Sequence, residues 1–170
     1  MPLPAFFVKS AEVIPCPCCG GQLSVIGSRP RKSIKGSGEV IQLVIRRLRC
    51  GDCRRIHHEL PDLLIPYKRY DAESIEHVIT EPTSLNIAAD ESTLYRWRSW
   101  FLAWLTYAQG CLQSIAIRFD LPVGNPSFTS QSALLSIGRY VGDATGWLVR
   151  AVRPIANLNL WIHTRSAFLS

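Results

Sequence analysis

Four cysteines form two pairs with the spacing of a tetrahedral metal site. Two residues separate Cys16 from Cys19, and two separate Cys50 from Cys53. Such a spacer places two thiolates at adjacent corners of a tetrahedron, and two pairs complete a closed four-cysteine zinc site. A closed site has no open position for a reacting water. We therefore predict one structural Zn²⁺ per chain, held by these four cysteines, which stabilises the fold and takes no part in catalysis.

The first pair lies in a segment that contains a third thiol, Cys18. We assign Cys16 and Cys19 as the ligands. Pro17 restricts the turn between them, and Gly20 allows the backbone to bend tightly behind the second ligand. Cys18 is then expected to point away from the metal.

Other interpretations of these side chains stay open from the sequence. His57 and His58 follow the second pair closely enough to replace a cysteine ligand, or they are ordinary strand residues. The pairs could also form disulfides or stay free thiols. However, the N-terminus does not resemble a secretory signal, and this spacing in a reducing compartment favours metal. The apolar neighbours of Cys111 indicate a buried thiol rather than a nucleophile.

Positive charge is concentrated in the first part of the chain. Residues 1–70 contain twelve Lys and Arg against five Asp and Glu, whereas residues 71–170 contain seven against eight. Arg outnumbers Lys by fifteen to four, and the forked guanidinium suits phosphate groups and base edges. The alternative is an ordinary solvated charged surface. The side chains predicted to contact phosphates are Arg31, Lys32, Lys35, Arg46, Arg47, Arg49, Arg54 and Arg55.

Three strands are expected to position the cysteines in a zinc ribbon over residues 1–62. Residues 22–28, 40–49 and 54–60 have the composition of short strands. Residues 29–38, between the first two strands, are expected to form a mobile basic loop. Because such a sheet has little core, we expect zinc to supply most of its folding free energy, of the order of 10 kcal/mol in small metal modules.

A linker and a capped helix are expected to follow the ribbon. Pro61 and Pro66 interrupt any helix over residues 61–70, so this segment is predicted to be a linker. Asp71 has the residue type of an N-cap, and the apolar pattern after it predicts a helix that runs to Ile79.

The next elements have the order of a helix-turn-helix within residues 63–108. A short helix is expected over 85–89, and a longer amphipathic helix over 93–105, capped by Asp90 or Ser92. In such a motif the last helix enters the major groove with its first residues at the base edges. The alternative is an ordinary three-helix cluster with solvated arginines. The side chains predicted to reach base edges are Thr93, Tyr95 and Arg96.

Residues 109–170 are expected to form a helical bundle or interface region. Gly138, Gly142 and Gly146 recur at every fourth position. A single helix over 132–152 would therefore have a bare face against which another backbone could pack closely.

One uncharged segment raises the question of a membrane span. Residues 99–117 lack charge, and nineteen residues are enough to cross a bilayer. However, the segment contains Gln109 and Gln113, and Gly110 divides it near the middle. We therefore expect two buried helices there and no contact with a membrane.

The order of these motifs resembles the zinc-ribbon and helix-turn-helix front end of insertion-sequence transposases, and especially small bacterial proteins associated with them. The resemblance covers residues 14–105 and is carried by the segments CPCCG, LRCGDC, LPDLLIPYKRY and STLYRWR. It implies that the four cysteines bind metal and that the helix starting near Ser92 contacts DNA. It implies no known activity.

The acidic residues argue against transposition by this chain itself. A DDE transposase needs three carboxylates on a ribonuclease-H-like sheet to hold two metal ions, and after Glu91 only Asp120 and Asp143 remain. The tail lacks the Arg and Tyr constellation of a tyrosine recombinase. No P-loop, HExxH or GxSxG motif occurs. We therefore expect that the chain is not an enzyme.

The combined prediction is an α+β protein with a zinc ribbon (1–62), a helix-turn-helix region (63–108) and a helical region (109–170). Its expected function is non-catalytic binding of double-stranded DNA, as an accessory of a mobile element or as a transcription regulator. The expected location is the cytoplasm, at the nucleoid. The C-terminal helices leave open a transposase or another protein as partner, and homo-oligomerisation. The competing hypothesis is a protein-interaction module that does not bind DNA.

Overall fold

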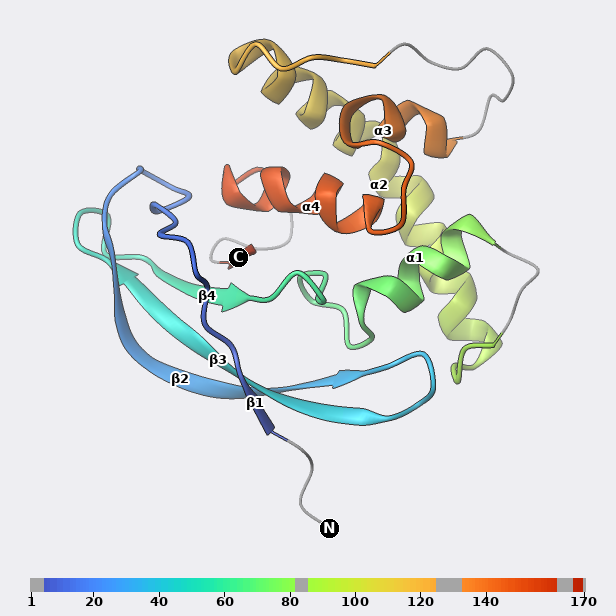
Figure 1. The fold of residues 1–170 in the computed structure, drawn as a ribbon, viewed down its shortest axis with the longest axis horizontal. Coiled ribbons are helices and arrows are strands. Elements are labelled where there is room, and N and C mark those ends of the chain that lie inside the picture. The colour runs from blue at the N-terminus through green and yellow to red at the C-terminus, as the bar shows by residue number, and fades with distance from the viewer. Residues whose placement is uncertain (1–4, 82–85, 125–132, 162–166, 170) are drawn as a thin grey trace.

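The computed structural model describes residues 5–81, 86–124, 133–161 and 167–169. In these residues a five-stranded sheet packs against four helices. Figure 1 shows the strands gathered on one side of the molecule and the helices on the other. The mixed α+β class expected from the sequence is confirmed.

A long antiparallel hairpin forms the main part of the sheet. It consists of β2 (Leu23–Ile34) and β3 (Val40–Cys50). The other edge of β3 pairs with two strands in succession, β1 (Ala5–Phe7) in parallel and β4 (Ile56–Leu60) in antiparallel orientation. The short strand β5 (Ala167–Leu169) then pairs in parallel with β4.

The three strands expected around the cysteines are present, but the basic loop predicted over 29–38 is wrong. Residues 29–34 continue β2, whose pairing with β3 extends to Ile34 opposite Val40. Only the turn around Gly38, which has a φ of 86°, connects the two strands. The sequence does not indicate a strand over residues 29–34 because the side chains there are mostly polar on both faces. The alternation of apolar and polar residues that is typical of a strand is therefore missing.

Two aspartates cap the first two helices as the sequence predicts. The side chain of Asp71 accepts a hydrogen bond from the backbone N–H of Ser74 at the start of α1 (Ala72–Thr80). Asp90 accepts one from the N–H of Thr93 at the start of α2 (Glu91–Arg118). Each carboxylate satisfies a backbone donor that the helix leaves free.

The helix α2 continues through Gly110, so the predicted division into two helices is wrong. A glycine inside a helix costs about 1 kcal/mol relative to alanine. Beyond it, Cys111, Leu112 and Ile115 are buried, and their burial offsets that cost because each large apolar side chain contributes about 1.5–3 kcal/mol. In the described part of the chain, no helix has both the length and the apolar composition that a membrane crossing requires.

The short helix expected over 85–89 is not present in residues 86–89, and Leu85 lies outside the described residues. These residues form bends, and the N–H of Ala88 donates to the carbonyl of Gly36 in the hairpin turn at 2.7 Å. Residues 86–89 therefore lie along the tip of the hairpin, and the middle helix of a helix-turn-helix is not seen in them.

The glycine-spaced segment forms two helices, so the single helix predicted over 132–152 is wrong. They are α3 (Ala133–Val141) and α4 (Trp147–Asn157). Gly142 and Gly146 have φ values of 77° and 87°, a left-handed conformation that favours glycine and interrupts a helix. These two glycines therefore mark helix ends rather than a packing face.

A buried carboxylate from α1 caps α4. The N-cap residue of α4, Gly146, has no side chain that could accept a hydrogen bond. Glu76 accepts from the N–H of Gly146 at 2.6 Å and from the N–H of Leu148 at 2.8 Å. The negative charge also lies at the positive end of the helix dipole. Glu76 thus joins two helices that are far apart in sequence.

We expect Glu76→Ala to lower the free energy of unfolding by about 1–3 kcal/mol, because it leaves the part-buried N–H of Gly146 and the buried N–H of Leu148 without an acceptor. Denaturant unfolding measures the loss. The matched control is Glu73→Ala on the exposed side of the same helix, which should change stability by less than about 0.5 kcal/mol. Equal effects of the two substitutions would contradict the capping role.

One hydrophobic cluster joins the sheet to all four helices. The segment 61–70, expected to be a linker, contributes Leu64 and Ile65, which are fully buried in this cluster. The predicted domain boundaries at residues 62 and 108 stay a prediction. Buried side chains on both sides of each boundary belong to the same cluster.

Candidate metal centre

Two tight turns bring the four cysteines together at one end of the β2–β3 hairpin. In the first turn the N–H of Gly20 donates to the carbonyl of Cys16 at 2.8 Å, and Gly20 has a φ of 76°. The second turn follows β3, and the N–H of Cys50 donates to the carbonyl of Arg55 at 3.0 Å. These turns are the knuckles that the sequence predicts.

The four sulfur atoms have the separations of a single tetrahedral site. All four lie within 4.8 Å of one another. Sγ of Cys16 is 3.6 Å from Sγ of Cys53, and Sγ of Cys19 is 3.5 Å from Sγ of Cys50. Zinc–sulfur bonds of about 2.3 Å give sulfur–sulfur distances of about 3.8 Å in a tetrahedron. The four cysteines therefore form a site that can bind one metal ion, and none of them is in a disulfide.

The surroundings of the thiols differ. Burial raises the pKa of Cys16 to about 12, whereas backbone N–H groups of Cys53 and Asp52 lower the pKa of Cys50 to about 7. Metal binding requires thiolates. A metal ion that enters this site must therefore displace a proton from Cys16 at neutral pH.

His57 is a strand residue that also contacts the cysteine cluster. It lies in β4 opposite Leu48 and is fully buried. Its Nε2 is 3.3 Å from Sγ of Cys16, and its Nδ1 is buried without a partner in the described residues. Burial lowers the pKa of His57, which favours the neutral ring. Once a metal ion has displaced the proton of Cys16, a neutral ring with its proton on Nε2 can donate to the resulting thiolate. The sequence left His57 open as a ligand or a strand residue and did not predict this contact.

Cys18 does not belong to the four-cysteine group. It lies within ligand distance of Cys16 and His57, which gives a second group of three possible ligands. Its Sγ accepts a hydrogen bond from Nη1 of Arg55 at 3.2 Å. The four-cysteine group has the complete set of ligands for a closed site, and we therefore keep Cys18 outside it.

Several basic residues predicted to contact phosphate have partners within the protein. Arg46 donates through Nε and Nη2 to the carboxylate of Glu59 at 2.5 and 2.7 Å. Nη2 of Arg31 donates to the carbonyl of Lys68 at 2.9 Å, and Lys35 pairs with Glu39 on the surface. The remaining members of the set are Lys32, Arg49 and Arg54, which are exposed, Arg47, which is half-buried, and Arg55.

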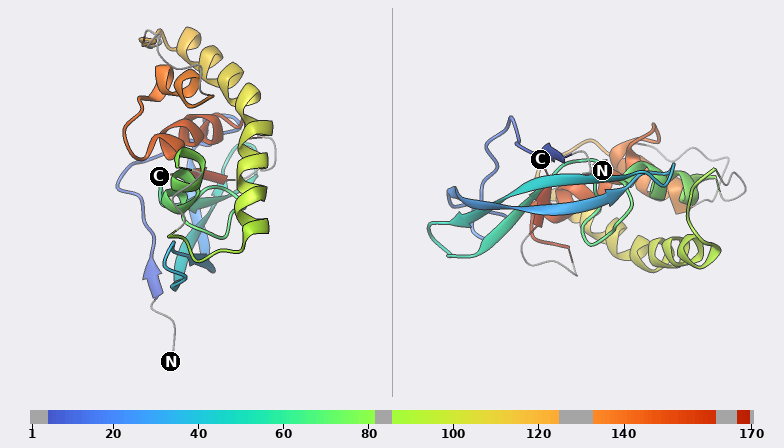
Figure 2. Two further views of the ribbon diagram at one scale, coloured as in Figure 1. Left: turned by 90° about the vertical axis from the view of Figure 1, so that its right-hand side faces the viewer. Right: turned by 90° about the horizontal axis from the view of Figure 1, so that it is seen from below.

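The three residues predicted to reach base edges lie on the first turns of α2. Tyr95 is 71% exposed. The guanidinium of Arg96 is also exposed and donates to the carbonyl of Ser92 and to Oγ1 of Thr93. Figures 1 and 2 place this end of α2 far from the cysteine turns, at the opposite end of the molecule.

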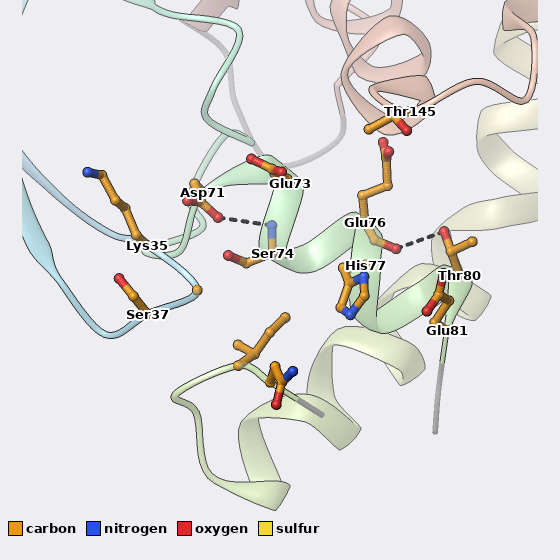
Figure 3. Close-up of a pocket in the computed structure, with 13 residues that line it drawn as sticks. Lys35, Ser37, Asp71, Glu73, Ser74, Glu76, His77, Thr80, Glu81 and Thr145 are labelled. Atoms are coloured by element: carbon orange, nitrogen blue, oxygen red, sulfur yellow. Dashed lines mark hydrogen bonds between the residues drawn. The ribbon is translucent and has the colours of Figure 1, made fainter. Parts of the chain in front are cut away.

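A cavity of about 450 Å³ lies between α1, the hairpin turn and the segment before α2. Figure 3 shows its acidic wall, with Glu73, Glu76 and His77 on α1 and Lys35 across the space. The carboxylates of Asp71 and Glu76 are already used as helix caps. None of the possible metal-binding groups in the described residues lies in this cavity, and we assign no chemistry to it.

Comparison with known families places the similarity in the first part of the chain. Residues 16–97 match the family model described as "Domain of unknown function (DUF6431)". The matched segment contains all four cysteines, the hairpin, α1 and the beginning of α2. No curated protein and no solved structure shows significant similarity to the chain. The match therefore spans the cysteine centre and the elements that follow it, up to the beginning of α2.

Proposed function

We propose that this chain is a zinc-stabilised, non-catalytic protein that binds double-stranded DNA, as an accessory of a mobile element or as a transcription regulator in the cytoplasm. The observation that carries the proposal is the closed four-cysteine centre at the end of a hairpin rich in arginine. Zinc is the proposed metal because four thiolates at tetrahedral separations suit it.

The charge of the hairpin and of the turn that follows β3 supports DNA as the partner. Arg47, Arg49 and Arg54 make no ion pair with a carboxylate in the described residues. Guanidinium groups that are free in this way can bind phosphate oxygens and release counterions from DNA. Base reading by Thr93, Tyr95 and Arg96 at the start of α2 belongs to the same proposal, and the exposed side chains of Tyr95 and Arg96 support it.

We expect the zinc-loaded protein to bind duplex DNA of random sequence with a steep dependence on salt. Each phosphate contact contributes about −0.9 to the slope of log K against log salt, so four contacts give about −3.6. A fourfold rise in salt should then weaken binding roughly a hundredfold. Fluorescence anisotropy with a labelled duplex measures the slope. Absence of binding at low salt would reject the DNA-binding function.

A second candidate is a protein-interaction module, and one feature of α2 favours it. The side of this helix that is turned to solvent lacks charge from Ser99 to Ile117 and exposes large apolar side chains. Leu102 is 63% exposed and Ile117 is 75% exposed. Such a face is typical of interaction sites. Light scattering of the purified protein, with Leu102→Glu as the variant, tests whether this face forms an oligomer.

A further inference from the structure

The register of the hairpin determines which arginines share a face. Directly opposite residues of an antiparallel pair project to the same side of the sheet. Arg31 lies opposite Leu43, and Arg29 lies opposite Ile45. Leu43 and Ile45 are buried in the core that joins the sheet to the helices. Arg29 and Arg31 therefore project from the side of β2 that faces the helices.

The last part of β3 adds two more arginines to this side. Side chains alternate along a strand, so Arg47 and Arg49 follow Ile45 on the same side. Arg47 pairs with His58 of β4, which projects with it. Arg46 lies between Ile45 and Arg47 and projects to the other side, where it pairs with Glu59.

Three of these arginines, Arg29, Arg31 and Arg47, lie close enough to His58 for their charges to act on it, and the group is partly open to solvent. The pKa of His58 is lowered by burial and then by the charges of Arg29, Arg47 and Arg31. Arg29 and Arg49 are exposed, and Arg47 and His58 are half-buried. In the part of the chain that the structure describes, none of the four arginines forms an ion pair with a carboxylate.

A group of guanidinium ions without a counterion on the protein is complementary to a polyanion. Bringing like charges together costs free energy, and a bound phosphate group removes this repulsion. Nη2 of Arg31 donates to the carbonyl of Lys68. This bond orients the guanidinium and leaves its other N–H donors available to a phosphate. No carboxylate competes with a phosphate for the other three arginines among the described residues.

We propose that Arg29, Arg31, Arg47 and Arg49, together with His58, form one phosphate-binding face for the backbone of duplex DNA. We refer to it as the arginine face. The inference rests on the proposed function and narrows it, because basic residues elsewhere on the ribbon then contribute little. Arg29 is thereby added to the residues that the sequence predicts to contact phosphate. Arg46 is removed from them, because its ion pair with Glu59 gives it a structural role.

The sheet offers a matched pair of variants for the test. Arg29 and Lys32 are both exposed residues of β2 and project to opposite sides. Arg29→Glu and Lys32→Glu make the same change in net charge on the same strand. We expect Arg29→Glu to weaken binding of a random duplex at least about tenfold and to reduce the salt slope by about 1. Lys32→Glu should change affinity by less than about threefold and leave the slope unchanged.

The possible outcomes distinguish a failure of the arginine face from a failure of the proposed DNA-binding function. If the unmodified protein binds duplex DNA but the two variants lose affinity equally, the arginine face is rejected and DNA binding stands. Full affinity of Arg29→Glu also rejects the face. If the unmodified protein does not bind duplex DNA at all, the proposed function itself fails. Zinc content and thermal unfolding of both variants are the controls. Values equal to those of the unmodified protein show that a lower affinity does not come from a loss of folded structure.

Discussion

Substitution of Cys19 by serine is expected to remove the metal and unfold the cysteine end of the sheet, whereas Cys18→Ser should leave both unchanged. No side chain in the first half of β2 is buried, and so we expect its pairing with β3 to depend on the turns that a bound metal would hold. Metal binding in small modules contributes of the order of 10 kcal/mol to folding. Metal analysis of the purified variants measures zinc content. Hydrogen exchange of the amides in residues 23–30 and 47–56 measures local unfolding.

The two cysteines are a matched pair because they are adjacent in one turn. Only Cys19 belongs to the four-sulfur group, while Cys18 lies within reach of Cys16 and His57. Zinc retained in Cys19→Ser and lost in Cys18→Ser would show that the second group is the real site. The helices should keep their structure in both variants, since the hydrophobic cluster that joins them contains no member of the four-cysteine site.

Substitution of Arg46 by alanine is expected to lower the free energy of unfolding by about 3–5 kcal/mol, because it leaves a buried carboxylate without its cation. The side chain of Glu59 is only 1% exposed and receives two hydrogen bonds from Arg46. After the substitution, the N–H of Ser10 is the remaining donor to this carboxylate among the described residues. Denaturant unfolding of the zinc-loaded protein measures the change.

Two further variants make this result specific. Arg49→Ala removes an exposed arginine from the same strand and should change stability by less than about 0.5 kcal/mol. The double variant Arg46→Met and Glu59→Met removes both charges and should recover much of the loss, since replacing a buried pair by apolar residues is often neutral. A loss for Arg46→Ala no larger than that for Arg49→Ala would contradict the structural role of the pair.

Local chemistry in the sequence was sufficient to predict the metal centre and the ends of several elements. The spacing of Cys16, Cys19, Cys50 and Cys53 identified a set of ligands that the turns bring within bonding distance of one ion. Asp71 and Asp90 marked two helix starts, because a capping side chain bonds to a backbone donor three residues away. Such features involve neighbours in sequence and can be recognised without knowledge of the fold.

Contacts between distant residues were decided only by the tertiary structure. Arg46 and Arg47 are adjacent and identical in the sequence, yet one pairs with buried Glu59 and the other lies on the arginine face. The difference comes from strand register, which depends on a partner strand that local composition does not identify. In the same way, Glu76 caps a helix seventy residues later in the chain, and its acceptor role exists only once α1 packs beside α4. The sequence by itself thus determined which residues could bind metal, and the packing of the strands and helices determined which charges are buried and which are free to bind.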